Sequence, residues 1–178
     1  MNATLENEAE RLKIEEIKSN PLKVCFVCTG NTCRSPMAEA ILNDLGRVPE
    51  YCSACPPEAL KKRRIRAASA GISAVDGMPI SQNAVLALQD GGIKALPDND
   101  YPNHRAKQVD ISDFVLNDII VGISSRHAMT LMANYPQFAS KIICTDEDIP
   151  DPFGGDIEDY KACMEKIRAS IERMFFGK

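Results

Sequence analysis

The chain alternates between short apolar runs and longer stretches in which apolar residues recur every three or four positions. The clearest run, Leu22 to Cys28, is rich in β-forming residues and too short for a buried helix, so it predicts a central strand. Further strands are predicted in the segments IRAASAG (65–71), DIIVGI (118–123) and KIIC (141–144).

Helical spacing is found in the stretches between these runs. From Thr4 to Lys18, apolar residues recur among many Glu and Lys, which predicts an amphipathic helix before the core. Ser35 and Pro36 offer an N-cap and a favoured first residue for a helix that runs up to Gly46. Further helices are predicted over residues 79–92, 125–135 and 157–175.

Strands that alternate with helices predict a parallel sheet covered by helices on both faces, an α/β fold. We expect one domain over residues 22–178, preceded by a helical extension over residues 1–21. A functional site would lie at the carboxyl ends of the strands, where Cys28 and Cys144 both fall. Long surface loops are predicted over residues 47–64 and 96–108.

Composition narrows the class of protein. With 178 residues, of which 44% are hydrophobic and 26% charged, the chain can bury one sizeable core. We expect a cytoplasmic protein, since no apolar run reaches the length of a membrane span and the polar amino terminus is unlike a signal peptide. We also expect it to be a monomer. Seven cysteines, an odd number, favour reduced thiols over a disulfide framework. The net charge of −4 gives no reason to expect nucleic-acid binding.

The segment VCFVCTGNTCRSP, residues 24–36, joins the first predicted strand to the next helix. A loop that closes onto a helix amino terminus directs several backbone N–H groups into one concavity, and the helix dipole adds partial positive charge there. The segment lacks the Gly-Lys-Ser/Thr ending of a nucleotide-binding loop and ends in Arg34, whose planar fork suits a phosphate-like oxyanion. We therefore expect a phosphoryl group as the ligand.

Cys28 begins this loop, where the N–H donors, the dipole and Arg34 should all favour the thiolate. A thiolate beneath a bound phosphoryl group is a nucleophile, and its reaction needs an acid that protonates the leaving atom. Asp151 is the candidate acid, because it follows the last predicted strand and precedes Pro152, which restricts its backbone. Rival carboxylates near this position are Asp146, Glu147, Asp148 and Asp156.

Three motifs resemble those of the low-molecular-weight protein tyrosine phosphatase family. They are CTGNTCRSPMAEA from Cys28, SAG from Ser69 and DPFGG from Asp151, and their order and spacing fit from Leu22 to the carboxyl end. The resemblance implies a three-layer α/β/α fold with a four-stranded parallel sheet. It also implies hydrolysis of phosphorylated protein substrates in two steps through a cysteinyl-phosphate, with no metal and no other cofactor.

The resemblance also assigns roles to individual residues. It makes Cys28 the nucleophile, Arg34 the phosphate clamp, Asp151 the general acid and Ser35 a hydrogen-bond donor to the thiolate. With Ser35, the residues implied to bind the phosphate or the substrate are Thr29, Gly30, Asn31, Thr32, Cys33 and Phe153, and hydrogen bonds of Asn31 and Ser69 are implied to hold the loop in shape.

Two positions are similar to the protein arginine phosphatase branch of the family. Tyrosine-directed members usually carry a bulky aliphatic residue at the position of Thr32, and many add a second aromatic wall where this chain has Gly154. We therefore expect phosphoarginine to be the preferred substrate, with a tyrosine phosphatase as the alternative. The amino-terminal helix and the insertion over residues 47–64 depart from the family pattern.

Other interpretations of the motifs remain open. Thiol-dependent arsenate reductases share a similar loop, but their further cysteines near the end of the third strand are absent from VGISSRHAM (121–129). A phosphate-binding module without turnover is an alternative of another class. The pairs Cys25/Cys28 and Cys52/Cys55 have zinc-ribbon spacing, although a strand through Cys25 and Cys28 places them on opposite faces and favours a core role for Cys25.

Three further residues have open roles. Cys33 is a candidate resolving thiol for Cys28 under oxidation, and a small buried residue is an equal alternative. His104 and His127 are expected to be packing or surface histidines, because the proposed chemistry needs neither.

Overall fold

The computed structural model describes residues 20–47, 50–51 and 62–177. The predicted helix from Thr4 to Lys18 and the pair Cys52/Cys55 lie outside these residues, so the extension over residues 1–21 and the zinc alternative stay predictions. No helix in the described ranges is both long enough and apolar enough to span a membrane.

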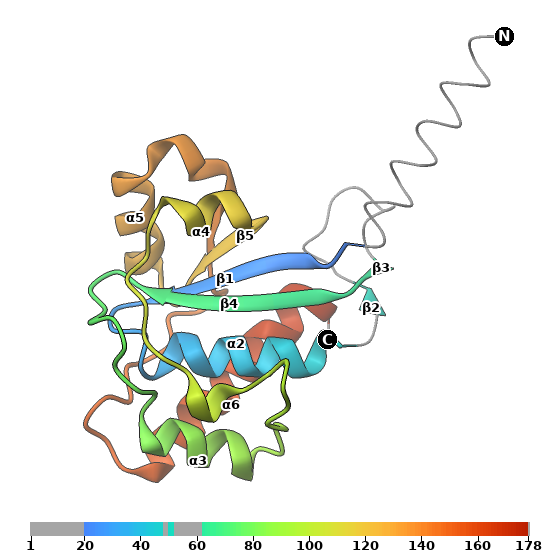
Figure 1. Ribbon diagram of the computed structural model, residues 1–178, viewed down its shortest axis with the longest axis vertical. Helices are drawn as coiled ribbons and strands as arrows, with labels where there is room; N and C mark the ends of the chain where they lie inside the picture. The colour runs from blue at the N-terminus through green and yellow to red at the C-terminus, as the bar shows by residue number, and fades with distance from the viewer. Residues whose placement is uncertain (1–19, 48–49, 52–61, 178) are drawn as a thin grey trace, which may run out of the picture.

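Four parallel strands form the central sheet, in the order β4-β1-β5-β6 (Figure 1). The strand β1 (Leu22–Cys28) pairs with β4 (Ile65–Gly71) on one side and with β5 (Ile119–Gly122) on the other. The last strand, β6 (Ile142–Cys144), pairs with β5. The prediction of four parallel strands is therefore confirmed.

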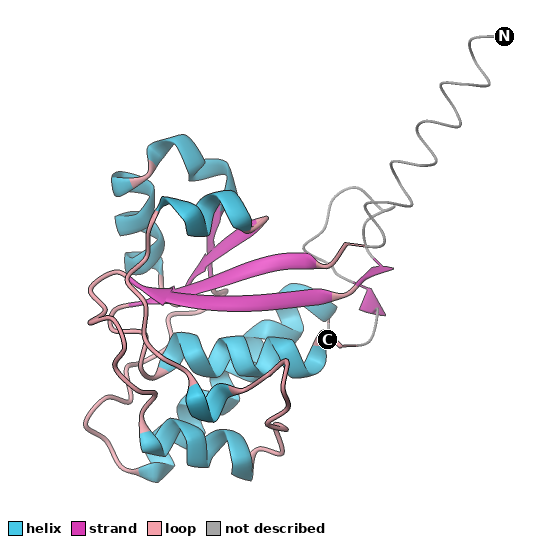
Figure 2. Cartoon of the chain, viewed as in Figure 1, coloured by secondary structure: helices cyan, strands magenta, loops and turns pink. Residues whose placement is uncertain are grey.

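Helices cover both faces of this sheet, which gives three layers (Figure 2). In Figure 1, α2 (Arg34–Leu45), α3 (Gln82–Asp90) and α6 (Ile157–Ile171) lie on one side of the sheet. On the other side lie α4 (Ile111–Leu116) and α5 (Ser125–Asn134). The expected α/β/α architecture is confirmed.

Alternate residues of β1 enter two separate cores. Val24, Phe26 and Cys28 pack in the cluster formed with α2, α3 and α6, whereas Cys25 and Val27 pack with Phe114 and Leu131 on the other face. This division follows from the two-residue period of a strand that is buried on both faces. Cys25 is fully buried, as expected, and burial raises the pKa of its thiol.

The helix α2 begins two residues earlier than predicted. Arg34 is its first residue and Cys33 occupies the N-cap position without a side-chain cap, so the prediction of Ser35 as the N-cap was wrong. The Ser35 hydroxyl instead lies 3.0 Å from Cys28 Sγ and 3.2 Å from the carbonyl oxygen of Ala70. The Ser35 side chain therefore contacts the strands β1 and β4 instead of capping the helix.

Several short elements were not predicted from the sequence. The helix α4 starts with a capping box formed by Asp110 and Asp113, a local signal that the sequence analysis missed. A short antiparallel pair, β2 (Glu50–Tyr51) with β3 (Lys62–Arg63), lies within the predicted surface loop over residues 47–64. The remaining unpredicted elements are the 3₁₀ helices Tyr101–Asn103 and Pro136–Lys141 and the π-helical turn Glu172–Phe176 that follows α6.

Candidate active site

The loop between β1 and α2 lies at the carboxyl edge of the sheet and turns sharply at Asn31. This residue is fully buried and has a φ of 53°, in the left-handed region that asparagine tolerates better than most residues. The loop also crosses close to β4, because a Cβ atom added at Gly71 would lie 2.6 Å from the carbonyl oxygen of Thr29. Gly71 therefore allows the loop to approach the end of β4.

Hydrogen bonds to Asn31 hold the loop in this conformation. Its side-chain amide donates to Ser35 Oγ and to Ser69 Oγ, both at 2.9 Å, and its Oδ1 accepts from the backbone N–H of Lys107 at 2.8 Å. Its backbone oxygen lies 3.2 Å from His104 Nε2. The contacts of Asn31 and Ser69 agree with the loop-supporting role that the sequence suggested for them.

The network continues from Ser69 to two ionisable residues that the sequence analysis did not connect with the loop. Ser69 Oγ donates to Glu39 Oε2 at 2.6 Å, and His104 Nδ1 lies 3.7 Å from the same oxygen. Burial raises the pKa of Glu39 to about 7, although the Ser69 hydrogen bond opposes this effect. Burial also lowers the pKa of His104.

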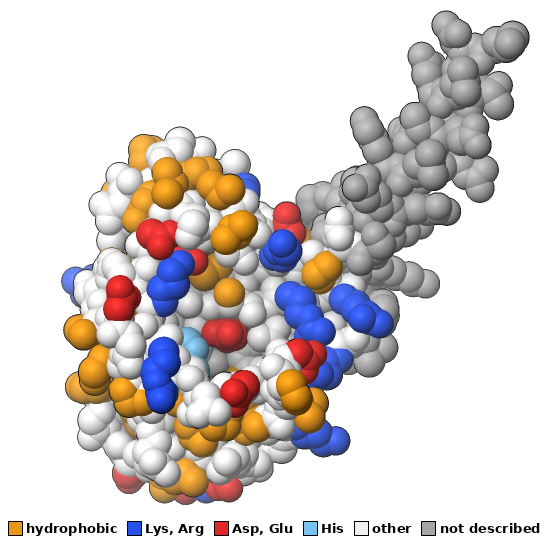
Figure 3. Space-filling view, viewed as in Figure 1, with side chains coloured by type: hydrophobic (Ala, Val, Ile, Leu, Met, Phe, Trp, Pro, Cys, Tyr) orange, Lys and Arg blue, Asp and Glu red, His pale blue; other side chains and the backbone are white. Residues whose placement is uncertain are grey.

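Glu39 and His104 also line a cavity of about 290 Å³ with Asn43, Asn99 and Tyr101. The space-filling view in Figure 3 shows a hollow in which a histidine and acidic side chains gather, with Lys and Arg side chains around it. Residues of the loop-supporting network therefore line a cavity that shares no lining residue with the thiol pocket described below.

Cys28 ends β1, and its sulfur lies beneath the loop with only 3% of the residue exposed. The backbone N–H of Asn31 donates to Cys28 Sγ at 3.3 Å, and Ser35 Oγ lies 3.0 Å from the sulfur. A serine hydroxyl has one proton, so Ser35 can accept from the thiol or donate to the thiolate. Donors directed at the sulfur stabilise negative charge on it.

Arg34 is buried beside the loop, with 8% of its side chain exposed. Its Nη1 donates to the carbonyl oxygen of Ile149 at 3.3 Å, and its Nη2 pairs with Asp151 Oδ2 at 2.5 Å. Its Nε–H is buried and has no hydrogen-bond partner among the described residues. Buried donors nearly always have a partner, and Arg34 also lines the pocket over the thiol.

Asp151 is the only one of the five candidate carboxylates that lines the pocket over the thiol. Each rival has partners elsewhere: Asp146 and Glu147 pair with Arg173, and Asp148 accepts from the backbone of Ser125 at 2.7 Å. Asp156 caps the amino terminus of α6. These contacts favour Asp151, whose side chain is 47% exposed, as the acid.

A pocket of about 230 Å³ opens above the thiol. It brings together the predicted residues Cys28, Thr29, Gly30, Thr32, Cys33, Arg34, Asp151 and Phe153. The ring of Phe153 is 77% exposed, as expected for a wall at the rim. Asn31, Ser35 and Ser69 lie behind the loop instead of lining the pocket, so a direct contact of Asn31 or Ser35 side chains with substrate is not supported.

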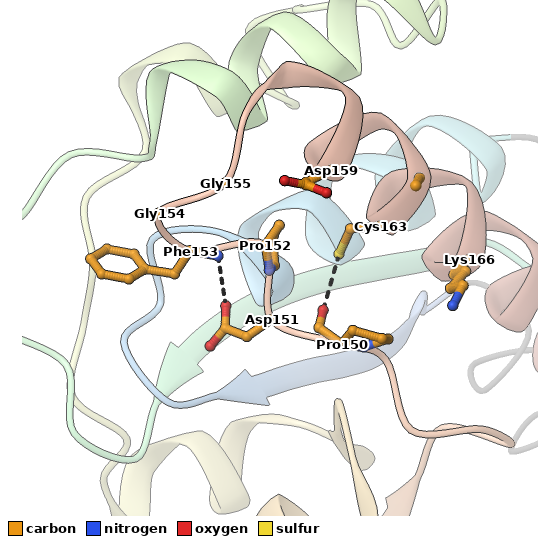
Figure 4. A pocket seen from close by; sticks show the side chains of 10 residues that line it. Pro150, Asp151, Pro152, Phe153, Gly154, Gly155, Asp159, Cys163 and Lys166 are labelled. Carbon is orange, nitrogen blue, oxygen red and sulfur yellow. Dashed lines mark hydrogen bonds between the residues drawn. The ribbon is translucent and has the colours of Figure 1, made fainter.

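A second cavity, of about 450 Å³, adjoins the thiol pocket at Asp151 and Phe153 (Figure 4). The segment 150–155 and the helix α6 line it, and Figure 4 shows Cys163 Sγ directed at the carbonyl oxygen of Pro150, at 3.7 Å. Gly154 has a φ of 82° there, a backbone conformation that glycine adopts without steric strain because it has no side chain.

The remaining cysteines have different surroundings. Cys33 lines the thiol pocket and its sulfur lies 3.2 Å from the hydroxyl of Tyr160. Burial raises the pKa of the Cys33 thiol. Its two predicted roles, as a resolving thiol for Cys28 and as a small buried residue, stay predictions. Cys144 is exposed at the end of β6 and does not line the thiol pocket.

Both histidines contact the loop, which corrects their interpretation as packing or surface residues alone. His127 Nε2 lies 3.0 Å from Thr29 Oγ1, and His127 Nδ1 lies 2.7 Å from Ser124 Oγ. Burial, and secondly the charge of Arg34, lower the pKa of His127 and favour its neutral ring at pH 7. The sequence held no local signal for these contacts, because His127 lies 98 positions from Thr29.

Known proteins are similar to this chain in sequence and in fold. The sequence profile described as low molecular weight phosphotyrosine protein phosphatase matches residues 23–177. The protein-arginine-phosphatase of Geobacillus stearothermophilus is 31% identical over 161 residues, which cover 86% of this chain and 94% of that protein. A low molecular weight protein-tyrosine-phosphatase of Streptomyces coelicolor is 30% identical over 166 residues, which cover 83% and 88%.

A solved structure agrees with these sequence matches. The low molecular weight protein tyrosine phosphatase from T. tengcongensis is similar with a TM-score of 0.70 and 34% identity, over 85% of this chain and 96% of that one. The profile match covers both the thiol loop and the segment that carries Asp151. The chain therefore belongs to the low molecular weight phosphotyrosine protein phosphatase family.

Proposed function

We propose that this protein is a cysteine-dependent phosphatase that removes the phosphoryl group from phosphorylated proteins, with phosphoarginine as its preferred substrate. The observation that carries the proposal is the unpartnered, buried Nε–H of Arg34 in a pocket that also contains Cys28. A phosphoryl oxygen is a suitable acceptor for this N–H, and a guanidinium is the side chain best matched to such an anion.

In the proposed first step, the Cys28 thiolate attacks phosphorus while the bond from phosphorus to the guanidino nitrogen breaks. The nitrogen leaves with the electron pair of that bond and takes a proton from Asp151. The loop N–H groups and Arg34 stabilise the charge on the three equatorial oxygens, which is the main requirement of phosphoryl transfer. The products are a cysteinyl-phosphate and the unmodified arginine side chain.

In the second step, water attacks phosphorus and the sulfur leaves as the thiolate. Asp151, now a carboxylate, accepts a proton from the water, and inorganic phosphate is released. Ser35 supports this step, because its hydroxyl lies 3.0 Å from the sulfur and can donate to the departing thiolate. The two steps together consume one water and regenerate Cys28 and the protonated Asp151.

The preference for phosphoarginine rests on the rim of the pocket. Thr32 lines the pocket with a hydroxyl and a methyl group, and its Oγ1 lies 3.6 Å from Cys33 Sγ. A guanidino group presents polar N–H groups that need partners on binding, whereas a phosphotyrosine ring presents an apolar surface. Phe153 is the aromatic ring that lines the pocket, and Gly154, the next residue, adds no second ring.

The test combines a general and a specific assay. Hydrolysis of para-nitrophenyl phosphate in EDTA, measured for the wild type and for Cys28→Ser, tests cysteine-dependent turnover without added metal. Peptides that carry phosphoarginine or phosphotyrosine in the same sequence then test the preference through kcat/KM. A wild type no more active than Cys28→Ser would refute the enzyme proposal and favour a phosphate-binding module.

Tyrosine phosphatase activity is the second candidate, because relatives of both kinds share about the same identity with this chain. A higher kcat/KM for phosphotyrosine peptides would establish it.

We further propose that the enzyme acts as a monomer in the cytoplasm, where a reducing environment keeps the nucleophilic thiol active. Light scattering of the purified protein and activity in fractionated cells test these two points.

A further inference from the structure

We infer that a polar cavity beside the thiol pocket binds an acidic side chain of the substrate polypeptide, with Arg126 as its cation. The inference rests on the proposed function and extends it from the phosphorylated residue to the sequence around that residue. The cavity has a volume of about 490 Å³ and is lined by residues of the thiol loop, of the segment after β4 and of the start of α5.

The cavity adjoins the thiol pocket. Thr29, Arg34 and Asp151 line both of them, so the two spaces meet at the residues proposed to hold and protonate the phosphorylated group. An extended chain advances about 3.3 to 3.6 Å per residue. A polypeptide whose phosphorylated side chain fills the thiol pocket therefore places a residue one to three positions away over the cavity.

The lining of the cavity suits a carboxylate. Arg126 is exposed and makes no ion pair with any described residue, whereas the exposed Arg173 is paired with two carboxylates. Ser73 and Thr130 line the same cavity and carry hydroxyl groups. The guanidinium fork of Arg126 matches a carboxylate, and the Ser73 hydroxyl can donate to one of its remaining lone pairs. The Thr130 hydroxyl donates instead to the backbone oxygen of Arg126, at 2.9 Å.

The acidic residues near this cavity already have partners. Asp151 pairs with Arg34, and Asp148 accepts from the N–H and the hydroxyl of Ser125 at 2.7 and 3.1 Å. His127, which also lines the cavity, is kept neutral by burial and by the Arg34 charge. Of the two arginines that line the cavity, Arg34 is paired with Asp151, so Arg126 is the one without a carboxylate partner among the described residues.

Lys166 provides a matched control on the opposite side of the pocket. It is exposed and lines the neighbouring cavity of about 450 Å³, whose other lining residues are mostly apolar. Removal of Lys166 changes the net charge as much as removal of Arg126 does but leaves the polar cavity intact. A selective effect at Arg126 thus separates a local contact from general electrostatic attraction.

The experiment uses two series of phosphopeptides, one with phosphoarginine and one with phosphotyrosine, in which a single Asp or Asn is placed at each of three positions on either side. We measure kcat/KM for the wild type, Arg126→Ala and Lys166→Ala. We expect the wild type to prefer Asp over Asn by about two- to fivefold at positions on one side, in the range of a solvent-accessible charge contact. Arg126→Ala should bring this ratio to about one, and Lys166→Ala should keep it.

Several outcomes would overturn the inference without affecting the proposed function. They are an Asp to Asn ratio near one in the wild type, a ratio unchanged in Arg126→Ala, and an equal loss in Lys166→Ala. All three leave turnover of the Asn peptides intact, and para-nitrophenyl phosphate turnover should be the same in the three proteins.

If the wild type hydrolyses none of these peptides, the proposed function fails and the cavity is tested by binding alone. The affinities of the Asp and Asn peptides for Cys28→Ser, with and without Arg126→Ala, are then measured by fluorescence anisotropy. Equal affinities for the Asp and Asn peptides would reject the inference in that case as well.

Discussion

Arg34 Nη2 lies 2.5 Å from Asp151 Oδ2, so the proposed phosphate clamp and the proposed acid are ion-paired with each other. The other oxygen of Asp151, Oδ1, accepts from the N–H of Phe153 at 3.2 Å. A phosphoryl group that enters the pocket competes with Asp151 for Arg34. Its arrival would release the Oδ2 atom to face the leaving atom, which links substrate binding to the position of the acid.

Replacement of Asp151 by Asn should remove the proton donor. We expect the rate of phosphoenzyme formation to fall about 10²- to 10⁴-fold, the usual contribution of a general acid, and to fall most for poor leaving groups. Burst kinetics with aryl phosphates of different leaving-group pKa measure this. Asp148→Asn is the matched control, because Asp148 binds Ser125 instead of lining the thiol pocket. An equal loss in the control would contradict the assignment of Asp151.

Replacement of Cys28 by Ser should abolish turnover and preserve binding of oxyanions. The serine hydroxyl is a far weaker nucleophile than a thiolate at neutral pH, whereas the loop N–H groups and Arg34 remain in place. We expect phosphate and vanadate to bind the variant, as measured by calorimetry. Turnover close to that of the wild type would mean that another residue is the nucleophile.

Replacement of Thr32 by Ile tests the substrate preference. The larger aliphatic side chain should fill the rim, leave the polar guanidino group without a partner and favour an aromatic ring. We expect kcat/KM to fall for phosphoarginine peptides and to hold or rise for phosphotyrosine peptides. A ratio of the two values that does not change would show that Thr32 only fits the backbone of the loop.

Replacement of Asn31 by Ala should destabilise both the loop and the fold. The change removes the acceptor of the Lys107 N–H, at about 1–3 kcal/mol for an unsatisfied donor, and it removes one of the two hydrogen bonds of Ser69 Oγ. Alanine also fits poorly at a φ of 53°. Asn31→Gly is the control, because glycine adopts this φ without strain but does not restore the lost hydrogen bonds. Urea unfolding should rank the wild type above the Gly variant and the Gly variant above the Ala variant; a Gly variant as stable as the wild type would contradict the hydrogen-bond argument.

Glu39 should make stability fall as the pH rises from about 4.5 to about 7. Burial raises the pKa of its carboxyl group from 4.5 to about 7 in the folded protein, so the folded state holds a proton that the unfolded state has lost in this range. Stability therefore decreases with pH until the folded state is deprotonated too. Glu39→Gln should remove this slope from urea-unfolding midpoints measured between pH 4.5 and 8.

His104 faces Glu39 and has a pKa lowered by burial, which acts in the opposite sense. The unfolded state binds the proton of this histidine more readily, so its contribution to stability rises with pH through its ordinary value of 6.5. The wild type and Glu39→Gln both carry His104, so the difference between their pH profiles reports the contribution of the Glu39 carboxyl group. Parallel pH profiles for the two proteins would contradict the raised pKa of Glu39.

The sequence by itself determined the layers of the fold and the identity of the chemical groups. The apolar runs at Leu22–Cys28 and Ile119–Gly122 encode strands locally, because burial on both faces requires nearly continuous apolar residues. The motif from Cys28 to Ser35 likewise places a thiol, a turn and a cation within one short segment. Such features depend on neighbours in the chain, which a single sequence displays.

Tertiary structure decided which distant residues complete the site. Asn31 is held by Ser69, His104 and Lys107, which the sequence separates from it by 38 to 76 positions. The choice of Asp151 among five carboxylates likewise depends on where the segment after β6 crosses the sheet edge. Hydrogen bonds and ion pairs reach only a few ångströms, so their partners are fixed by the packing of whole elements and leave no period or spacing in the chain.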